Sequence, residues 1–147
     1  MKNIFTAFLA IALMPFSAFG HDAPSTSEEK TSYIEDHIKL FETEATRIDT
    51  YIKKSVPAVR FALKNTGSET LTRIKVIVYF LDDSGQPFFE EDFLPVHVSD
   101  YSVQNGKPLK PNYTFRMDAG QYYTIEKLGD EWAGKVEFEI SDIEFAE

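Results

Sequence analysis

Residues able to perform acid–base, nucleophilic or metal chemistry are few and scattered in this chain. Cysteine is absent, and the three histidines, His21, His37 and His97, do not stand at metal-ligand spacing from one another. The carboxylates of Asp82-Asp83 do not fit the spacing of a calcium-binding loop. No G-x-S-x-G motif and no glycine-rich phosphate loop occurs. We therefore expect no catalytic residue, no metal site and no cofactor, and we do not expect an enzyme.

Aromatic side chains offer a second kind of site, one that binds rather than reacts. Phe88, Phe89, Tyr122 and Tyr123 form two adjacent pairs, and we expect them to form the interaction surface. If the four side chains make a contiguous exposed patch, the partner is a protein. If they line an enclosed cavity, the protein is instead a carrier for an apolar small molecule.

These side chains must be positioned by strands, because apolar residues recur with a period of two. In the stretch from Val59 to Lys64, Val59, Phe61 and Leu63 share one face, which predicts a half-buried strand. Leu71 to Leu81 is apolar on both faces, which predicts a central strand covered on both sides. Further strands are predicted at Pro87 to Leu94, Tyr113 to Met117 and Lys135 to Phe145. The pattern predicts an all-β fold, an antiparallel immunoglobulin-like β-sandwich of about seven strands.

The last of these strands changes its phase part-way along. Val136, Phe138 and Ile140 share one face, whereas Ile143 and Phe145 belong to the other phase. This slip predicts a β-bulge around Ser141-Asp142, or a strand that passes from one sheet to the other.

The connections between strands have turn chemistry of their own. Asn65-Thr66-Gly67-Ser68 predicts a tight hairpin between the first two strands, and Asp82 to Gly85 predicts the next turn. Residues 100–112 predict a long connection, whose K-P-L-K-P run is typical of a rigid polyproline-like spacer. Around the single tryptophan, Trp132, we expect one helical turn with Asp130 as its N-cap and an aromatic plug at one end of the sandwich.

Residues 33–55 fit two patterns. Ile34, Ile38, Phe41, Ala45, Ile48 and Ile52 are spaced as on one side of a helix. Ile38 and Leu40 also alternate with charged residues, and three threonines favour extended backbone. We favour a strand over about 38–48 and a turn through Lys53-Lys54, with the helix as the alternative.

The segments V-R-F-A-L-K-N-T-G-S-E-T-L and V-I-V-Y-F-L-D-D-S-G-Q-P resemble those of bacterial FxLYD-type domains, which are immunoglobulin-like extracytoplasmic modules. Val76 to Gly85 matches the second signature, with Phe80-Leu81-Asp82 at its aromatic-x-Asp position. The resemblance covers about residues 38–118. It implies a fold and a compartment, and it implies no catalytic or binding residues.

The N-terminal residues predict secretion. Residues 1–20 hold a lysine, an apolar run and small residues before His21, which is the pattern of a cleaved signal peptide. Residues 21–32 lack periodicity and predict a flexible leader, so that residues 33–147 form the single β-sandwich domain. The net charge of −9 opposes binding to nucleic acid or to anionic lipid surfaces.

We therefore expect a periplasmic or secreted, non-catalytic module that binds an unknown envelope protein and does not insert into the membrane after cleavage. The alternative is a carrier that binds an apolar small molecule in an aromatic-lined cavity.

Overall fold

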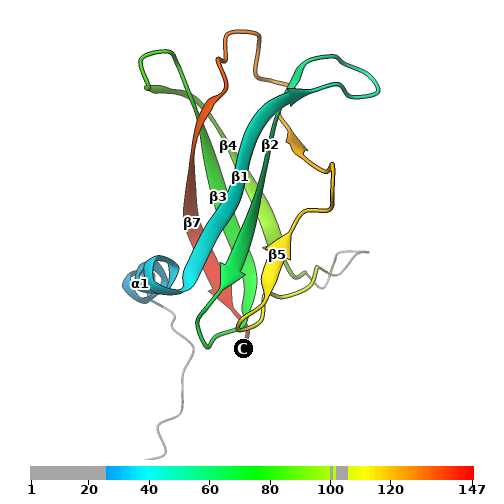
Figure 1. Cartoon of the computed structure of the whole chain (residues 1–147). Helices are drawn as coiled ribbons and strands as arrows, with labels where there is room; N and C mark the ends of the chain where they lie inside the picture. The colour runs from blue at the N-terminus through cyan, green and yellow to red at the C-terminus, as the bar shows by residue number, and fades with distance from the viewer. Residues whose placement is uncertain (1–25, 100, 102–105) are drawn as a thin grey trace, which may run out of the picture.

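The computed structural model describes residues 26–99, 101 and 106–147. One short helix precedes the strands (Figure 1). The elements in chain order are α1 (Ser27–His37), β1 (Ile38–Ile48), β2 (Val56–Asn65), β3 (Leu71–Leu81), β4 (Pro87–His97), β5 (Thr114–Arg116), β6 (Tyr123–Thr124) and β7 (Lys135–Phe145). The predicted signal peptide and the first part of the predicted leader lie outside the described residues.

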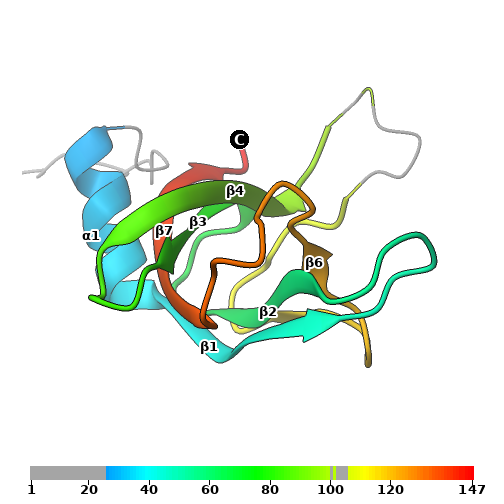
Figure 2. The ribbon, with the colours of Figure 1, turned by 90° about the horizontal axis from the view of Figure 1, so that it is seen from above.

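The strands form two antiparallel layers, which are seen end-on in Figure 2. One sheet has the order β1-β2-β5, with β6 also paired to β2, and the other has the order β4-β3-β7. The chain crosses from one sheet to the other after β2, after β4 and after β6. The core between the two sheets is therefore built from strands that lie in different parts of the sequence. The predicted all-β sandwich of about seven strands is confirmed.

β3 is the central strand of its sheet, as predicted. Ile74, Val76, Val78 and Phe80 face the other sheet and are fully buried. Within the part of the chain that the structure describes, the expected cover on the opposite face is absent, and Ile77 and Tyr79 there are only half-buried. Neighbouring polar side chains shield this face instead. The Tyr79 hydroxyl donates to Glu139 on β7 at 2.7 Å, and Lys75 pairs with Asp92 on β4 at 2.8 Å.

The predicted hairpin at residues 65–68 is wrong. β2 and β3 belong to different sheets, so this connection crosses the sandwich. Asn65 is fully buried at this crossing, and both the oxygen and the nitrogen of its side-chain amide are hydrogen-bonded. Its Oδ1 accepts from the Tyr33 hydroxyl and the Gly67 amide, each at 3.0 Å. Its Nδ2 donates to the carbonyls of Glu69 at 2.7 Å and Leu109 at 3.2 Å. Asn65 of the K-N-T-G motif thus joins three segments, which are α1, the 65–70 crossing and the segment before β5, rather than closing a hairpin.

The strand reading of residues 38–48 is confirmed, because β1 pairs with β2 along its length. A helix does form, but earlier than the alternative placed it. α1 begins at Ser27, so the leader prediction is wrong for residues 27–32. The reason is a capping box, in which the Thr26 side chain accepts from the Glu29 amide while the Glu29 carboxylate accepts from the Thr26 amide. Tyr33 is the buried residue of α1 and attaches the helix to the sandwich.

The predicted bulge in β7 is also confirmed. Asp142 pairs with Lys75 and Ile140 pairs with Val76, so Ser141 is the extra residue. The strand stays in one sheet along its whole length. The extra residue lets Ile143 reach the core although its phase differs from that of Ile140.

The helical turn expected around Asp130 does not form, because residues 125–134 are turns and irregular backbone. Trp132 nevertheless closes one end of the core, as predicted. Its ring is 3% exposed and meets Phe80 edge-on at 5.4 Å. Its indole N–H donates to the Lys135 carbonyl at 2.8 Å.

Candidate functional site

The two phenylalanines of the predicted interaction surface lie at the start of β4. Phe89 pairs across from Phe80 and packs on that ring edge-on at 5.8 Å, so it belongs to the core. Phe88 has no partner in the register, because Leu81 is opposite Pro87. It is a bulge residue and is 43% exposed.

The two tyrosines of that surface lie at β6 on the other sheet. Tyr123 stacks on Phe93 at 4.5 Å and on Phe61 at 5.7 Å, and burial raises the pKa of its hydroxyl. The Tyr122 hydroxyl donates to Glu44 at 3.1 Å, and the Arg60 guanidinium lies 5.3 Å from its ring. The structure therefore does not bring the four aromatic residues together. Phe89 and Tyr123 pack into the core from opposite sheets, and Phe88 and Tyr122 remain apart on the surface.

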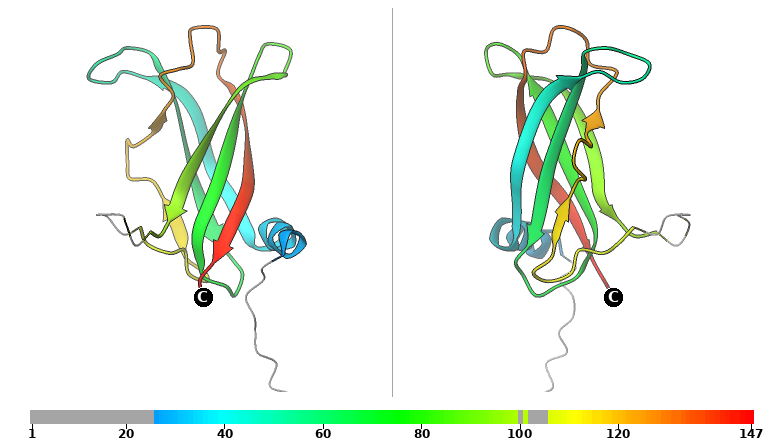
Figure 3. Two further views of the ribbon diagram at one scale, coloured as in Figure 1. Left: turned by 180° about the vertical axis from the view of Figure 1, so that it is seen from behind. Right: turned by 45° about the vertical axis from the view of Figure 1, so that its right-hand side comes forward.

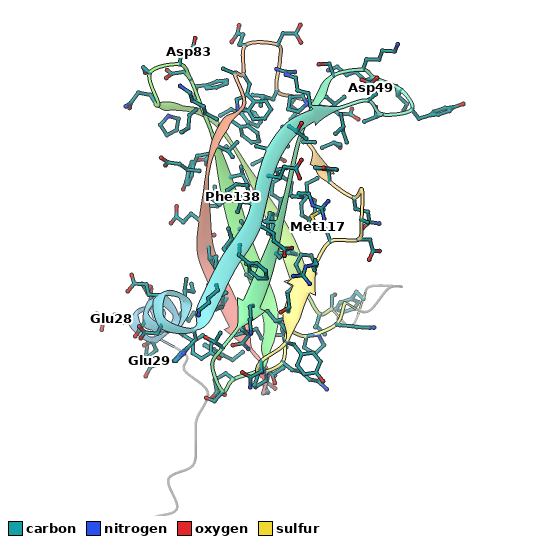
Figure 4. All side chains as sticks on the ribbon, viewed as in Figure 1. Glu28, Glu29, Asp49, Asp83, Met117 and Phe138 are labelled. Atoms are coloured by element: carbon teal, nitrogen blue, oxygen red, sulfur yellow. The ribbon has the colours of Figure 1, made fainter. Side chains whose placement is uncertain are left out.

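Two grooves follow the side of the sandwich where sheet β1-β2-β5 is interrupted between β5 and β6. The first, which we call the edge pocket, encloses about 420 Å³ between β4, residues 107–110 and β5. It is lined by Val96, Lys107, Pro108, Leu109, Lys110, Tyr113, Thr114, Phe115 and Arg116. The second encloses about 660 Å³ under residues 117–123, which leave the sheet and return to it. Met117, labelled in Figure 4, lies on this excursion.

A different pair of neighbouring large apolar side chains is almost fully exposed. Tyr51 and Ile52 are 105% and 91% exposed. They lie on residues 49–55, the loop between β1 and β2, which we call the tip loop. It projects from the end of the sandwich near Asp49 (Figure 4). The sequence predicts only a turn through Lys53-Lys54 here. Two large apolar residues within it were a signal that could have been used.

The tip loop is braced by its own polar groups. The Thr50 amide donates to the Lys53 carbonyl at 2.8 Å, and the Lys53 amide donates to the Thr50 hydroxyl at 3.0 Å. The Ser55 amide donates to the Asp49 carboxylate at 2.9 Å, and Arg47 donates to the Ser55 carbonyl at 2.9 Å. These bonds hold Tyr51 and Ile52 outward on an ordered loop.

The strand edges at β1, β4 and β7, by contrast, are built against pairing with another strand. β1 is interrupted next to Glu42, which has a φ of 50°, and β4 carries Pro87 and Pro95 beside register shifts. β7 has its bulge at Ser141, next to which Asp142 binds Lys30 of α1 at 3.3 Å. Bulges, prolines and covering segments are the usual means of blocking strand addition.

The acidic residues singled out in the sequence serve local structure. The Asp82 carboxylate accepts from the Ser84 amide at 2.9 Å, the Ser84 hydroxyl at 2.6 Å and the Gln86 amide at 2.9 Å. These bonds, above all the one from the Ser84 side chain, lower the pKa of Asp82. Asp142 lies near Lys30 and Arg73. Within residues 26–99, 101 and 106–147, no three His, Asp or Glu side chains gather as metal ligands would.

No family model, curated protein or solved structure matches this chain. Among the described residues, no helix has the length and apolar character needed to cross a membrane.

Proposed function

We propose that this chain is a non-catalytic interaction module of the cell envelope, periplasmic or secreted, which binds another envelope protein through its tip loop. The observation that carries this proposal is the near-complete exposure of Tyr51 and Ile52 on a hydrogen-bonded loop. Isolated exposed apolar residues are common, but two large neighbours held outward form a surface that a partner can bury.

The chemistry of the tip suits a protein partner. Tyrosine is enriched where interfaces have their strongest contacts, because its ring buries a large area with few rotatable bonds. Because the loop is already braced by Thr50 and Asp49, little conformational entropy is lost on binding. The blocked strand edges support the tip over strand addition as the route of recognition.

The envelope location is supported by sequence features alone. The first twenty residues have the pattern of a signal peptide, and the segments around Asn65 and Asp82 resemble the extracytoplasmic FxLYD-type domains. The net charge of −9 argues against nucleic acid as the partner.

Site-specific photocrosslinking in the producing cells tests the proposal. A benzophenone side chain replaces Tyr51 in the full chain, and in a control it replaces Asp83, an exposed residue on the neighbouring loop at the same end (Figure 4). We expect one discrete adduct from position 51 that is absent from position 83. Mass spectrometry of the adduct would then identify the partner.

A second change distinguishes recognition from chance contact. Ile52→Ser in the chain that carries the crosslinker should remove the adduct while leaving the fold intact, because the Ile52 side chain is outside the core. Equal adducts from positions 51 and 83, no adduct at all, or an adduct that survives Ile52→Ser would each overturn binding through the tip.

A further inference from the structure

The edge pocket has a preformed apolar floor. Val96 on β4 and Leu109 are 2% and 4% exposed, and the half-buried Phe115 of β5 completes the apolar lining. Leu109 is fixed to β3, because its amide and carbonyl both bond to the backbone of Leu71, at 2.8 and 3.0 Å. The Asn65 side chain donates to the Leu109 carbonyl as well, at 3.2 Å. The pocket therefore exists without any rearrangement of the chain.

The charge of the pocket is opposite to that of the protein. The lining holds three cations, Lys107, Lys110 and Arg116, and no carboxylate, although the chain has 24 acidic residues against 15 basic ones. The groove under residues 117–123 contains Asp118, and a further groove between α1, β1 and β7 contains Glu35 and Glu139.

The side chains of the two lysines are not used in the fold. The Lys107 and Lys110 side chains are exposed, and their ammonium groups have no hydrogen-bond or carboxylate partner among the described residues. Arg116 is held in place by two bonds of 2.8 Å to the Glu42 carboxylate and lies 5.7 Å from the Phe41 ring. An anion at the pocket mouth would thus meet two free ammonium groups beside an already neutralised guanidinium.

We propose that the edge pocket binds an amphipathic carboxylate, a molecule with an alkyl chain and one anionic head group. The alkyl chain lies on Val96, Leu109 and Phe115, where burial of each methylene contributes to binding. The carboxylate accepts charge-assisted hydrogen bonds from Lys107 and Lys110. A volume of about 420 Å³ is within the range of small-ligand sites.

The location of the pocket separates it from the tip loop. β5 and residues 107–110 lie toward the end of the sandwich opposite to the tip, beside β4 (Figure 3). The proposal does not depend on protein binding by Tyr51 and Ile52, and its failure would leave the crosslinking result unchanged.

Isothermal titration of the purified protein with dodecanoate tests the proposal, with dodecylamine as a probe that has the same chain and the opposite head charge. We expect saturable one-to-one binding of dodecanoate and binding of dodecylamine weaker by about tenfold or more, since the cationic head meets two lysines. Amide chemical shifts in the NMR spectrum should move at Thr114 and Phe115, which line the pocket.

The double variant Lys107→Gln/Lys110→Gln should weaken dodecanoate binding about tenfold or more, because two charge-assisted bonds are lost. Its matched control is Lys54→Gln/Lys127→Gln, which removes the same charge from exposed residues at the other end and should bind as the parent does. All four lysines are exposed, so the fold should survive both changes. Absent binding, equal binding of the two head groups, or equal loss in both double variants would overturn the proposal.

Discussion

The buried amide of Asn65 provides the sharpest test of how this sandwich is held together. Its side chain makes four hydrogen bonds, to groups from α1, from the 65–70 crossing and from the segment before β5. The residue is fully buried, so water cannot replace these partners once the amide is removed. We therefore predict that Asn65→Ala destabilises the protein far more than a typical polar substitution.

The magnitude follows from the partners left behind. Each buried group that loses its only partner costs about 1 to 3 kcal/mol. The Glu69 carbonyl keeps a bond from the Tyr33 hydroxyl at 3.3 Å and the Leu109 carbonyl keeps one from the Leu71 amide at 3.0 Å, whereas the Gly67 amide loses its partner. Loss of each of the other three bonds of the Asn65 side chain adds about 0.5 to 1.5 kcal/mol. We expect Asn65→Ala to lower the free energy of unfolding by about 3 to 5 kcal/mol, a large share of the ~5 to 15 kcal/mol of a typical domain. Tyr33→Phe should cost about 1 to 2 kcal/mol, because only the hydroxyl is lost.

Asn65→Asp tests the direction of the bonds. It replaces the two N–H donors by an acceptor that faces the carbonyls of Glu69 and Leu109. Burial beside these oxygens raises the folded-state pKa of the new carboxyl above its unfolded value of about 3.9. A raised pKa means that the protonated folded form is favoured, so this variant should lose stability as the pH rises from about 4 to 7 relative to the parent.

Urea denaturation followed by tryptophan fluorescence is the assay, because Trp132 is the only tryptophan and is 3% exposed. The control is Asn112→Gly, which removes an exposed asparagine at a φ of 65°, where glycine is tolerated. A loss below about 1 kcal/mol for Asn65→Ala would refute the role of the amide. A pH-independent penalty for Asn65→Asp would refute the bond directions.

Two further predictions concern the strand edges. Arg116 lowers the pKa of Glu42 mainly through its hydrogen bond to that carboxylate, so Arg116→Gln should raise the Glu42 pKa toward its ordinary value. NMR titration of the Glu42 side chain measures this, and an unchanged pKa would contradict the pairing. Deletion of Ser141 should be tolerated, because it removes the bulge and leaves a regular alternation that keeps Ile140 inside. Deletion of Glu139 should clearly lower the urea midpoint of unfolding, because it breaks that alternation. Equal urea midpoints for the Ser141 and Glu139 deletions would show that the bulge does not set the register of β7.

Most of the strands were predictable because their signal is local. Alternation with a period of two depends only on which face of a strand is buried, so the strand around Phe61 and the central strand could be recognised directly. The Ser141 bulge was predictable for the same reason, since a change of phase within one strand needs an extra residue. The capping box of Thr26 and Glu29 was an equally local signal, and it was overlooked within a segment whose composition suggested disorder.

The partners of those strands could not be predicted in this way. Asn65-Thr66-Gly67 has the residues of a hairpin turn, but whether a turn closes a hairpin or crosses between sheets depends on where the next strand finds its neighbours. β3 pairs with β7, more than fifty residues further along, and no local pattern encodes that choice. The aromatic pairs were mispredicted for a local reason instead, because alternation sends adjacent side chains such as Tyr122 and Tyr123 to opposite faces. Phe88 lies in a bulge beside the paired Phe89.

The sequence by itself thus determined that this chain is an antiparallel sandwich, where most of its strands run and where one of them bulges, because these properties follow from the burial of alternate residues. Only the tertiary structure decided which strands are neighbours, that Asn65 joins the crossing to α1, and that Lys107 and Lys110 line one pocket with Val96 and Phe115. The physical reason is that these arrangements depend on contacts between distant segments, whose free energy appears only when both sheets have assembled.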